Sequence, residues 1–184
     1  MDDSGLVVFP THRMVGGLDD FKENKVLAIL DTTFEIEKHL TASPDNMEAA
    51  LNANKDKKTF AFYTGKDYFY LLKLKDEDAM ANALPQKSDA YRSLDVSILH
   101  TLILEKVLGI DAENLANQSN IIYTRDAQEA IRLTAEGKFQ CSFLLNSTKV
   151  KEIKDVSLAA EKMPQKSTYF YPKLVTGIVM NRLK

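Results

Sequence analysis

The feature that most constrains the fold of this chain is the apolar stretch Leu94–Leu108. Its large aliphatic side chains recur at helical spacing in two adjacent rows: Leu94, Ile98 and Leu102, and Leu99, Ile103 and Val107. Leu104 and Leu108 widen this apolar stripe, so the sequence predicts a helix that is largely buried. Ser93 is placed to cap its start, and Gly109 follows its end.

A chain of 184 residues is long enough to build a core around such a helix, and we expect a single domain over residues 1–184. Apolar or alternating runs predict strands at Leu6–Phe9, Phe34–Glu37, Ile121–Tyr123, Phe139–Leu145 and Leu174–Met180. Helical spacing and capping residues predict helices within Phe21–Thr33, after Ser43-Pro44, within Asp76–Leu84, after Asp126 and through Val150–Val156.

Two combinations of these elements define the fold class. The aromatic run Thr59–Leu74 reads as an antiparallel hairpin that turns at Gly65–Asp67. The strand, helix and strand between Ile121 and Leu145 form a βαβ candidate, for which a right-handed parallel crossover is the default. We therefore expect an α/β or α+β domain with a mixed sheet of about five or six strands flanked by helices.

The apolar runs and the N-terminus indicate where the protein resides. No apolar run approaches the roughly 18 residues that suggest a membrane span. The acidic start Met1–Gly5 lacks the apolar core of a secretion signal. We expect a cytoplasmic protein with no membrane partner.

The cysteine and histidine counts limit the chemistry. One cysteine cannot form an internal disulfide, and with three scattered histidines it cannot build a Cys/His zinc cluster. Cys141 lies in an apolar strand-like run, so we interpret it as a buried structural thiol rather than a reactive one. We predict no metal site, and the sequence identifies no cofactor.

The charge is unevenly distributed. A net charge of −2 argues against general nucleic-acid binding. The segment from Lys162 to Lys184 contains five basic residues and no acidic one, so residues 1–161 carry −2 − 5 = −7. The basic tail either packs against acidic groups of the same fold or creates a local positive field for an anion.

The first candidate for chemistry is Pro10–Arg13, which follows a predicted strand and reads as a strand-end loop. Thr11 offers a hydroxyl, His12 a group that titrates near neutrality, and Arg13 a bidentate fork for carboxylate or phosphate. The alternative is that Arg13 pairs with a nearby acid such as Asp19 or Asp20 and that His12 is simply exposed.

The second candidate is Met163–Lys173, which two prolines exclude from a helix interior. If it is extended, hydroxyls and an ammonium share one face, a chemistry that suits an anionic oxygen. A turn at Ser167-Thr168 would break that pattern, and the alternative is a surface loop with aromatic anchors. The candidate anion-binding residues of both segments together are Thr11, His12, Arg13, Lys166, Ser167, Thr168, Tyr169 and Lys173.

Other catalytic signals are weak or missing. His100 lies near a narrow polar strip of the predicted buried helix, where a hydrogen-bonded structural histidine is favoured over a catalytic base. The chain has no glycine-rich phosphate loop, no HExxH and no Gly-x-Ser-x-Gly motif. No catalytic residue can be assigned, and His12 is the best general acid/base candidate.

Three segments carry a family resemblance: Pro10–Arg13, Leu94–His100 and Met163–Lys173. They resemble the bacterial and archaeal domain-of-unknown-function family 1015, and the resemblance covers essentially the whole chain. Proteins similar to this one are about twice as long, and their N-terminal half carries an Asp-Gly-His-His-Arg motif like that of free serine kinases. The resemblance implies a phosphotransferase ancestry for the whole protein. It supplies no established catalytic residue for this chain.

The Asp-Gly-His-His-Arg motif is absent from this chain, and this absence agrees with a second observation. Asp2–Gly5 has hairpin-turn chemistry but only Met1 before it, so we expect the chain to be the C-terminal portion of a longer protein.

Two functions remain open. In the first, the chain is part of a nucleotide- or phosphate-handling enzyme whose N-terminal half is missing, and His12 and Lys173 converge in one cleft. In the second, it is a non-catalytic binding or scaffold domain. Its strand Leu6–Phe9 then leaves an exposed edge that pairs with the missing half or with a second copy of the chain.

Overall fold

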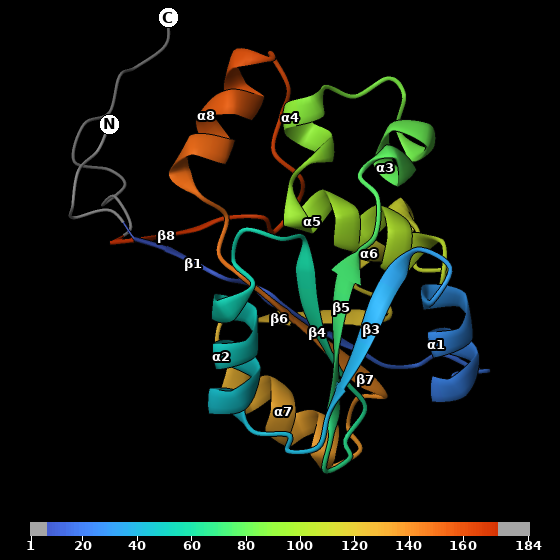
Figure 1. Cartoon of the computed structure of the whole chain (residues 1–184). Helices are drawn as coiled ribbons and strands as arrows, with labels where there is room; N and C mark the ends of the chain where they lie inside the picture. Colours follow the sequence, from blue (N-terminus) through green and yellow to red (C-terminus); the bar gives the residue numbers. More distant parts are fainter. Residues whose placement is uncertain (1–6, 173–184) are drawn as a thin grey trace, which may run out of the picture.

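A computed structural model describes residues 7–172 of the chain (Figure 1). Its centre is a six-stranded sheet in the order β3–β5–β4–β7–β2–β6. These strands are β2 (His12–Val15), β3 (Phe34–His39), β4 (Thr59–Tyr63), β5 (Phe69–Leu74), β6 (Ile121–Thr124) and β7 (Cys141–Leu145). The predicted class is confirmed, and so is the hairpin β4–β5.

Every pair of neighbouring strands in this sheet is antiparallel, so the sheet is antiparallel throughout rather than mixed. The predicted βαβ unit exists in a split form. Helix α7 (Ala127–Ala135) connects β6 to β7, and these two strands run parallel because each is antiparallel to β2. Strand β2 lies between them, which no local pattern in the βαβ segment could indicate.

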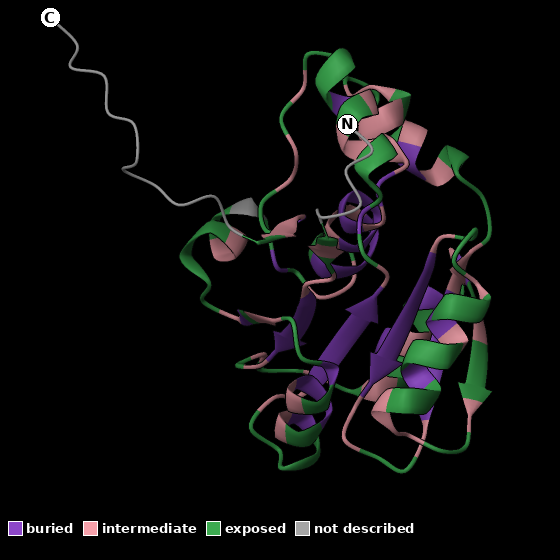
Figure 2. Cartoon of the chain, turned by 90° about the vertical axis from the view of Figure 1, so that its left-hand side faces the viewer, coloured by how far each residue is buried: buried purple, intermediate pink, exposed green. Residues whose placement is uncertain are grey.

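Helices cover both faces of the sheet. On one face lie α2 (Pro44–Ala53) and α7, which pack against Met14, Ala61 and Leu144. The other face carries α1 (Glu23–Leu30), α3 (Asp78–Ala83), α5 (Asp95–Ile98) and the π-helix η1 (Leu99–Glu105). Figure 2 shows that burial is concentrated in the strands between the two layers.

The predicted helix Leu94–Leu108 is present and largely buried, but it is not a uniform α-helix. It begins as α5 and widens into η1. The prediction that Ser93 caps it is wrong, because Ser93 ends the short helix α4 (Asp89–Arg92) and its hydroxyl donates to the carbonyl of Ala90. Leu94 occupies the N-cap position instead.

The remaining elements are α6 (Ala112–Asn117), α8 (Val150–Leu158) and a separate two-stranded ribbon. In this ribbon β1 (Val7–Phe9) pairs antiparallel with β8 (Tyr169–Tyr171), so the first and last described strands lie side by side. The predicted strand Leu174–Met180 and the turn Asp2–Gly5 lie outside the described residues. Within residues 7–172, no helix combines the length and the apolar character needed to cross a bilayer.

Candidate functional site

Pro10–Arg13 is not a strand-end loop, because His12 and Arg13 begin the buried strand β2, which lies between β7 and β6 in the sheet. Two polar side chains in a four-residue strand conceal the apolar pattern by which a strand is recognised. Since side chains alternate along a strand, His12 and Met14 point to the α2–α7 layer, and Arg13 and Val15 point to the layer that contains η1.

Arg13 is 0% exposed, yet it makes no ion pair with any carboxylate of residues 7–172. Its contacts are to neutral acceptors: the carbonyl of Thr11, the carbonyl of Lys166 at 3.1 Å from Nη2, and Nε2 of His100 at 3.2 Å from Nη2. Its Nε has no partner. Burial lowers the pKa of Arg13 to about 10, so the guanidinium remains charged at neutral pH. The expected pairing with Asp19 or Asp20 is not made.

His100 reaches Arg13 from the second residue of the π-helix η1. An arginine can only donate, so Nε2 of His100 must accept and the ring proton must lie on Nδ1. Burial, followed by the charge of Arg13, lowers the pKa of His100 to about 3. His100 is therefore a neutral imidazole with a fixed tautomer.

Two further residues complete what we call the Arg13 cluster, defined as Arg13, His100, Tyr123 and Lys166. Tyr123 lies directly opposite Arg13 on β6, with the guanidinium carbon 5.4 Å from its ring centroid. The ammonium of Lys166 lies 5.9 Å from the same centroid. The hydroxyl of Tyr123 is buried without a hydrogen-bond partner. The cluster contains two cations and no anion.

The second candidate segment forms the rim of this cluster. Gln165 and Lys166 make a turn in which Lys166 has a positive φ of 53°, so the segment is not extended before β8. Ser167 is buried, and its carbonyl accepts from the Thr148 hydroxyl at 2.8 Å. Thr168 is half-buried, and the ring of Tyr169 lies 4.0 Å from the guanidinium carbon of Arg125. Lys173 lies outside the described residues.

His12 occupies a different place from Arg13. It lines a hollow of about 270 Å³ on the α2–α7 side, together with Glu48, Asn52, Asn146 and Ser147. Burial, reinforced by the charge of Arg13, lowers the pKa of His12 to about 4, and its Nδ1 is buried without a partner. The structure thus brings Arg13 and Lys166 together and directs His12 to the opposite face.

The sequence reasoning did not single out Tyr123, Arg125 or Thr148. A possible signal was the polar run after β6, Thr124–Asp126, but the register that places Tyr123 opposite Arg13 is a long-range property. Cys141 is buried and free, as predicted, and burial raises its pKa. Within residues 7–172, no group of three or more His, Cys, Asp or Glu side chains is arranged to hold a metal.

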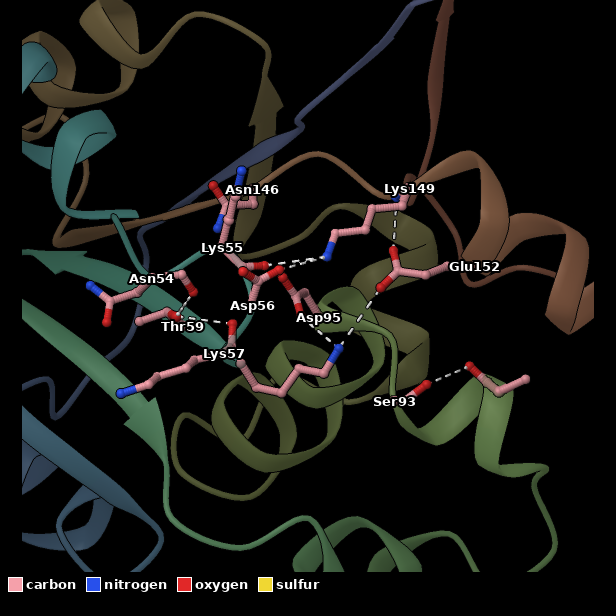
Figure 3. Close-up of polar contacts among 12 residues, drawn as sticks. Asn54, Lys55, Asp56, Lys57, Thr59, Ser93, Asp95, Asn146, Lys149 and Glu152 are labelled. Atoms are coloured by element: carbon pink, nitrogen blue, oxygen red, sulfur yellow. Dashed lines mark hydrogen bonds and ion pairs between the residues drawn. The ribbon is translucent and has the colours of Figure 1, made fainter. Parts of the chain in front are cut away.

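A network of polar contacts joins Lys149, Glu152 and Asp95 (Figure 3). The ammonium of Lys58 lies 3.4 Å from Asp95 and 3.8 Å from Glu152, and Glu152 accepts from the backbone of Lys149 at 2.8 Å. These contacts join the residue before β4, the start of α5 and the first turn of α8. Thr148, the residue before Lys149, donates its hydroxyl to the Ser167 carbonyl and so connects this region to the segment that follows Lys166.

Asp95 makes this network sensitive to pH. Burial raises the pKa of Asp95 to about 6, although Lys58 opposes the shift. Between about pH 4 and pH 6, the Asp95 carboxyl is therefore protonated in the folded protein but ionised in the unfolded chain. Its contribution to the free energy of unfolding is largest below pH 4, where both states are protonated. The contribution is lost as the pH rises from about 4 to about 6.

Asp95→Asn is expected to remove this pH dependence of the free energy of unfolding. The dependence amounts to up to about 3 kcal/mol, because each pKa unit corresponds to ~1.4 kcal/mol. Urea unfolding of both proteins at pH 4, 5 and 6.5 measures it. The stability of the wild type relative to Asp95→Asn should fall with rising pH, and a constant difference would contradict the prediction.

Comparison with known proteins gives a family and a fold. The family model described as "Protein of unknown function (DUF1015)" matches residues 1–97. That match lies in the N-terminal half of the chain and does not confirm the expectation of a C-terminal portion. No curated protein matches the chain.

Solved structures match most of the chain at low identity. A conserved hypothetical protein from Pyrococcus furiosus has a TM-score of 0.51 and 15% identity over 92% of this chain and 57% of its own. A free serine kinase in complex with AMP has a TM-score of 0.49 and 16% identity over 92% of this chain and 56% of its own. This chain thus spans little more than half the length of these proteins, and the Pyrococcus protein establishes similarity of fold alone.

Proposed function

Because the chain belongs to the DUF1015 family, whose description assigns no activity, we propose its function from the site: the domain binds an anionic, phosphate-bearing ligand at the Arg13 cluster. The observation that carries this proposal is a fully buried guanidinium that has only neutral acceptors among the described residues. A buried charge without a counter-charge costs several kcal/mol, so such an arrangement is retained where the charge has a use.

The surroundings of Arg13 favour an anion over a cation. The ammonium of Lys166 is exposed at the rim, and the guanidinium of Arg125 lies nearby over Tyr169. Arginine and lysine both donate charge-assisted hydrogen bonds to phosphate oxygens. A ligand at this rim would meet the ammonium of Lys166, with the buried guanidinium of Arg13 behind it as a fixed positive charge.

The remaining predicted residues have subsidiary roles in this proposal. Thr11, Ser167, Thr168 and Tyr169 would supply hydroxyl and backbone groups to the ligand, and Lys173 would add an ammonium. A nucleotide is one member of the ligand class, and kinase-like phosphoryl transfer is the reaction class that we propose for the longer protein. A general acid/base role for His12 requires the ligand to extend around the start of β2 to the other face of the sheet.

Calorimetric titration of the protein with inorganic phosphate, AMP and ADP tests this proposal. We expect binding of at least one of these anions, weakened roughly tenfold by Lys166→Ala because one charge-assisted contact is lost. Arg125→Ala should act in the same direction. Lys25→Ala, at an exposed position on α1, is the matched control and should bind as the wild type does. Failure of all three anions to bind at millimolar concentration would overturn the proposal.

The ribbon β1–β8 supports a second candidate, a scaffold domain that pairs with another chain. Val7, Phe9 and Tyr171 are 45%, 38% and 57% exposed, and a two-stranded ribbon is marginally stable without a cover. Light scattering after size-exclusion chromatography distinguishes the candidates. If the protein is monomeric both at high concentration and after 100-fold dilution, self-association through this ribbon is excluded.

A further inference from the structure

A separate hollow of about 270 Å³ adjoins the Arg13 cluster on the side of η1. Its polar lining comprises Lys87, Tyr91, His100, Thr101, Glu105 and Gln165. We propose that this hollow is the subsite that receives the phosphate group itself, with Nδ1–H of His100 and the ammonium of Lys87 as the groups that hold it. This inference rests on the proposed function and deepens it by naming the residues that contact the anion.

The hydrogen bond from Arg13 dictates which proton His100 can offer. With Nε2 occupied by the Nη2 donor of Arg13, His100 has a single donor left, Nδ1–H. That group has no hydrogen-bond partner among residues 7–172. Burial, reinforced by the charge of Arg13, lowers the pKa of His100 and keeps the imidazole neutral, so His100 acts as a fixed donor and not as a base. Arg13 is thus a positioning residue that acts through His100.

The π-helical conformation around His100 supports a role for this residue in ligand binding. His100 and Thr101 lie in a seven-residue π-helix, a wider and rarer form that recurs at functional sites. Thr101 brings a hydroxyl to the same hollow, and Gln165 brings an amide from the turn that also carries Lys166. The hollow therefore receives donors from two segments far apart in the sequence.

Size and charge define the ligand group. A hollow of about 270 Å³ is smaller than the roughly 300–1,000 Å³ of sites that enclose drug-sized ligands, so it suits a phosphate group better than a whole nucleotide. The ammonium of Lys87 lies 3.3 Å from Glu161 and 4.5 Å from the ring centroid of Tyr91. Glu105 contributes an opposing negative charge, so its removal should tighten phosphate binding.

Phosphate titration of four variants, each verified for a native fold by circular dichroism, tests the assignment. We expect His100→Gln and Lys87→Met to weaken binding of inorganic phosphate roughly tenfold each, and Glu105→Gln to tighten it about threefold. Lys106→Met is the matched control, because Lys106 follows Glu105 but lines a different hollow. A parallel titration with AMP distinguishes free phosphate from a nucleotide as the source of the group.

Nitrogen NMR of the imidazole provides a readout that a purely structural role would not produce. The ring of His100 should show the Nδ1–H tautomer, and its Nδ1–H signal should shift on addition of phosphate. The Nε2–H tautomer, or phosphate binding that none of His100→Gln, Lys87→Met and Glu105→Gln alters, would overturn this inference and leave the proposed function standing. Absence of any anion binding by the wild type would overturn both.

Discussion

Arg13→Ala is expected to lower the free energy of unfolding by about 3–5 kcal/mol, as large-to-small changes in a core do. The side chain fills a fully buried position between Phe143 and Tyr123. Its removal leaves a cavity and deprives the Lys166 carbonyl and the His100 ring of their donor. Urea unfolding at pH 7 measures the loss.

Arg13→Met separates packing from charge in the same experiment. Methionine keeps most of the volume and removes a buried charge that no carboxylate of residues 7–172 compensates, so the lost hydrogen bonds and the recovered desolvation energy should nearly cancel. We expect Arg13→Met to stay within about 1 kcal/mol of the wild type while phosphate binding is abolished. A cost below 1 kcal/mol for Arg13→Ala would show that the guanidinium is not a packed part of the core.

The second large effect is acid sensitivity from two buried histidines. Burial lowers the pKa of His12 to about 4 and that of His100 to about 3, against an ordinary histidine pKa of 6.5. Between pH 6.5 and about pH 4, the two histidines are therefore protonated in the unfolded chain but remain neutral in the folded protein. The stabilising contribution is complete above pH 6.5 and is lost as the pH falls toward 4, by on the order of 3 kcal/mol for each histidine.

Urea unfolding between pH 7.5 and pH 4.5 should show this decline, and His12→Asn and His100→Gln should each flatten it. His39→Gln removes the third, half-buried imidazole and is the matched control. A decline that both variants leave unchanged would show that other groups cause it.

Local patterns predicted most of the fold. The hairpin β4–β5, the cap of α2 by Ser43 and the cap of α7 by Asp126 depend on residues close in sequence, and all three are present. Strand β2 was missed because its four residues include His12 and Arg13, whose burial depends on strands more than 100 residues away. The widening of the buried helix into η1 likewise has no local signature in Leu99–Glu105.

The candidate site was predictable as chemistry but not as geometry. Hydroxyl, ammonium and guanidinium groups identified two segments, and the structure places Arg13 of the first against Lys166 of the second. The alternation of side chains in β2 then separates His12 from Arg13, which a loop assignment could not anticipate. Tyr123 belongs to the cluster only because the register between β2 and β6 places it opposite Arg13.

The split βαβ unit has a consequence for how the domain acquires its site. Strands β6 and β7 cannot bond to each other directly, since the gap between them is filled by a strand from the other end of the chain. That same strand carries Arg13, whose contact with Lys166 spans 153 positions. Assembly of the sheet and assembly of the cationic cluster are therefore one event, and a partly folded chain would have neither.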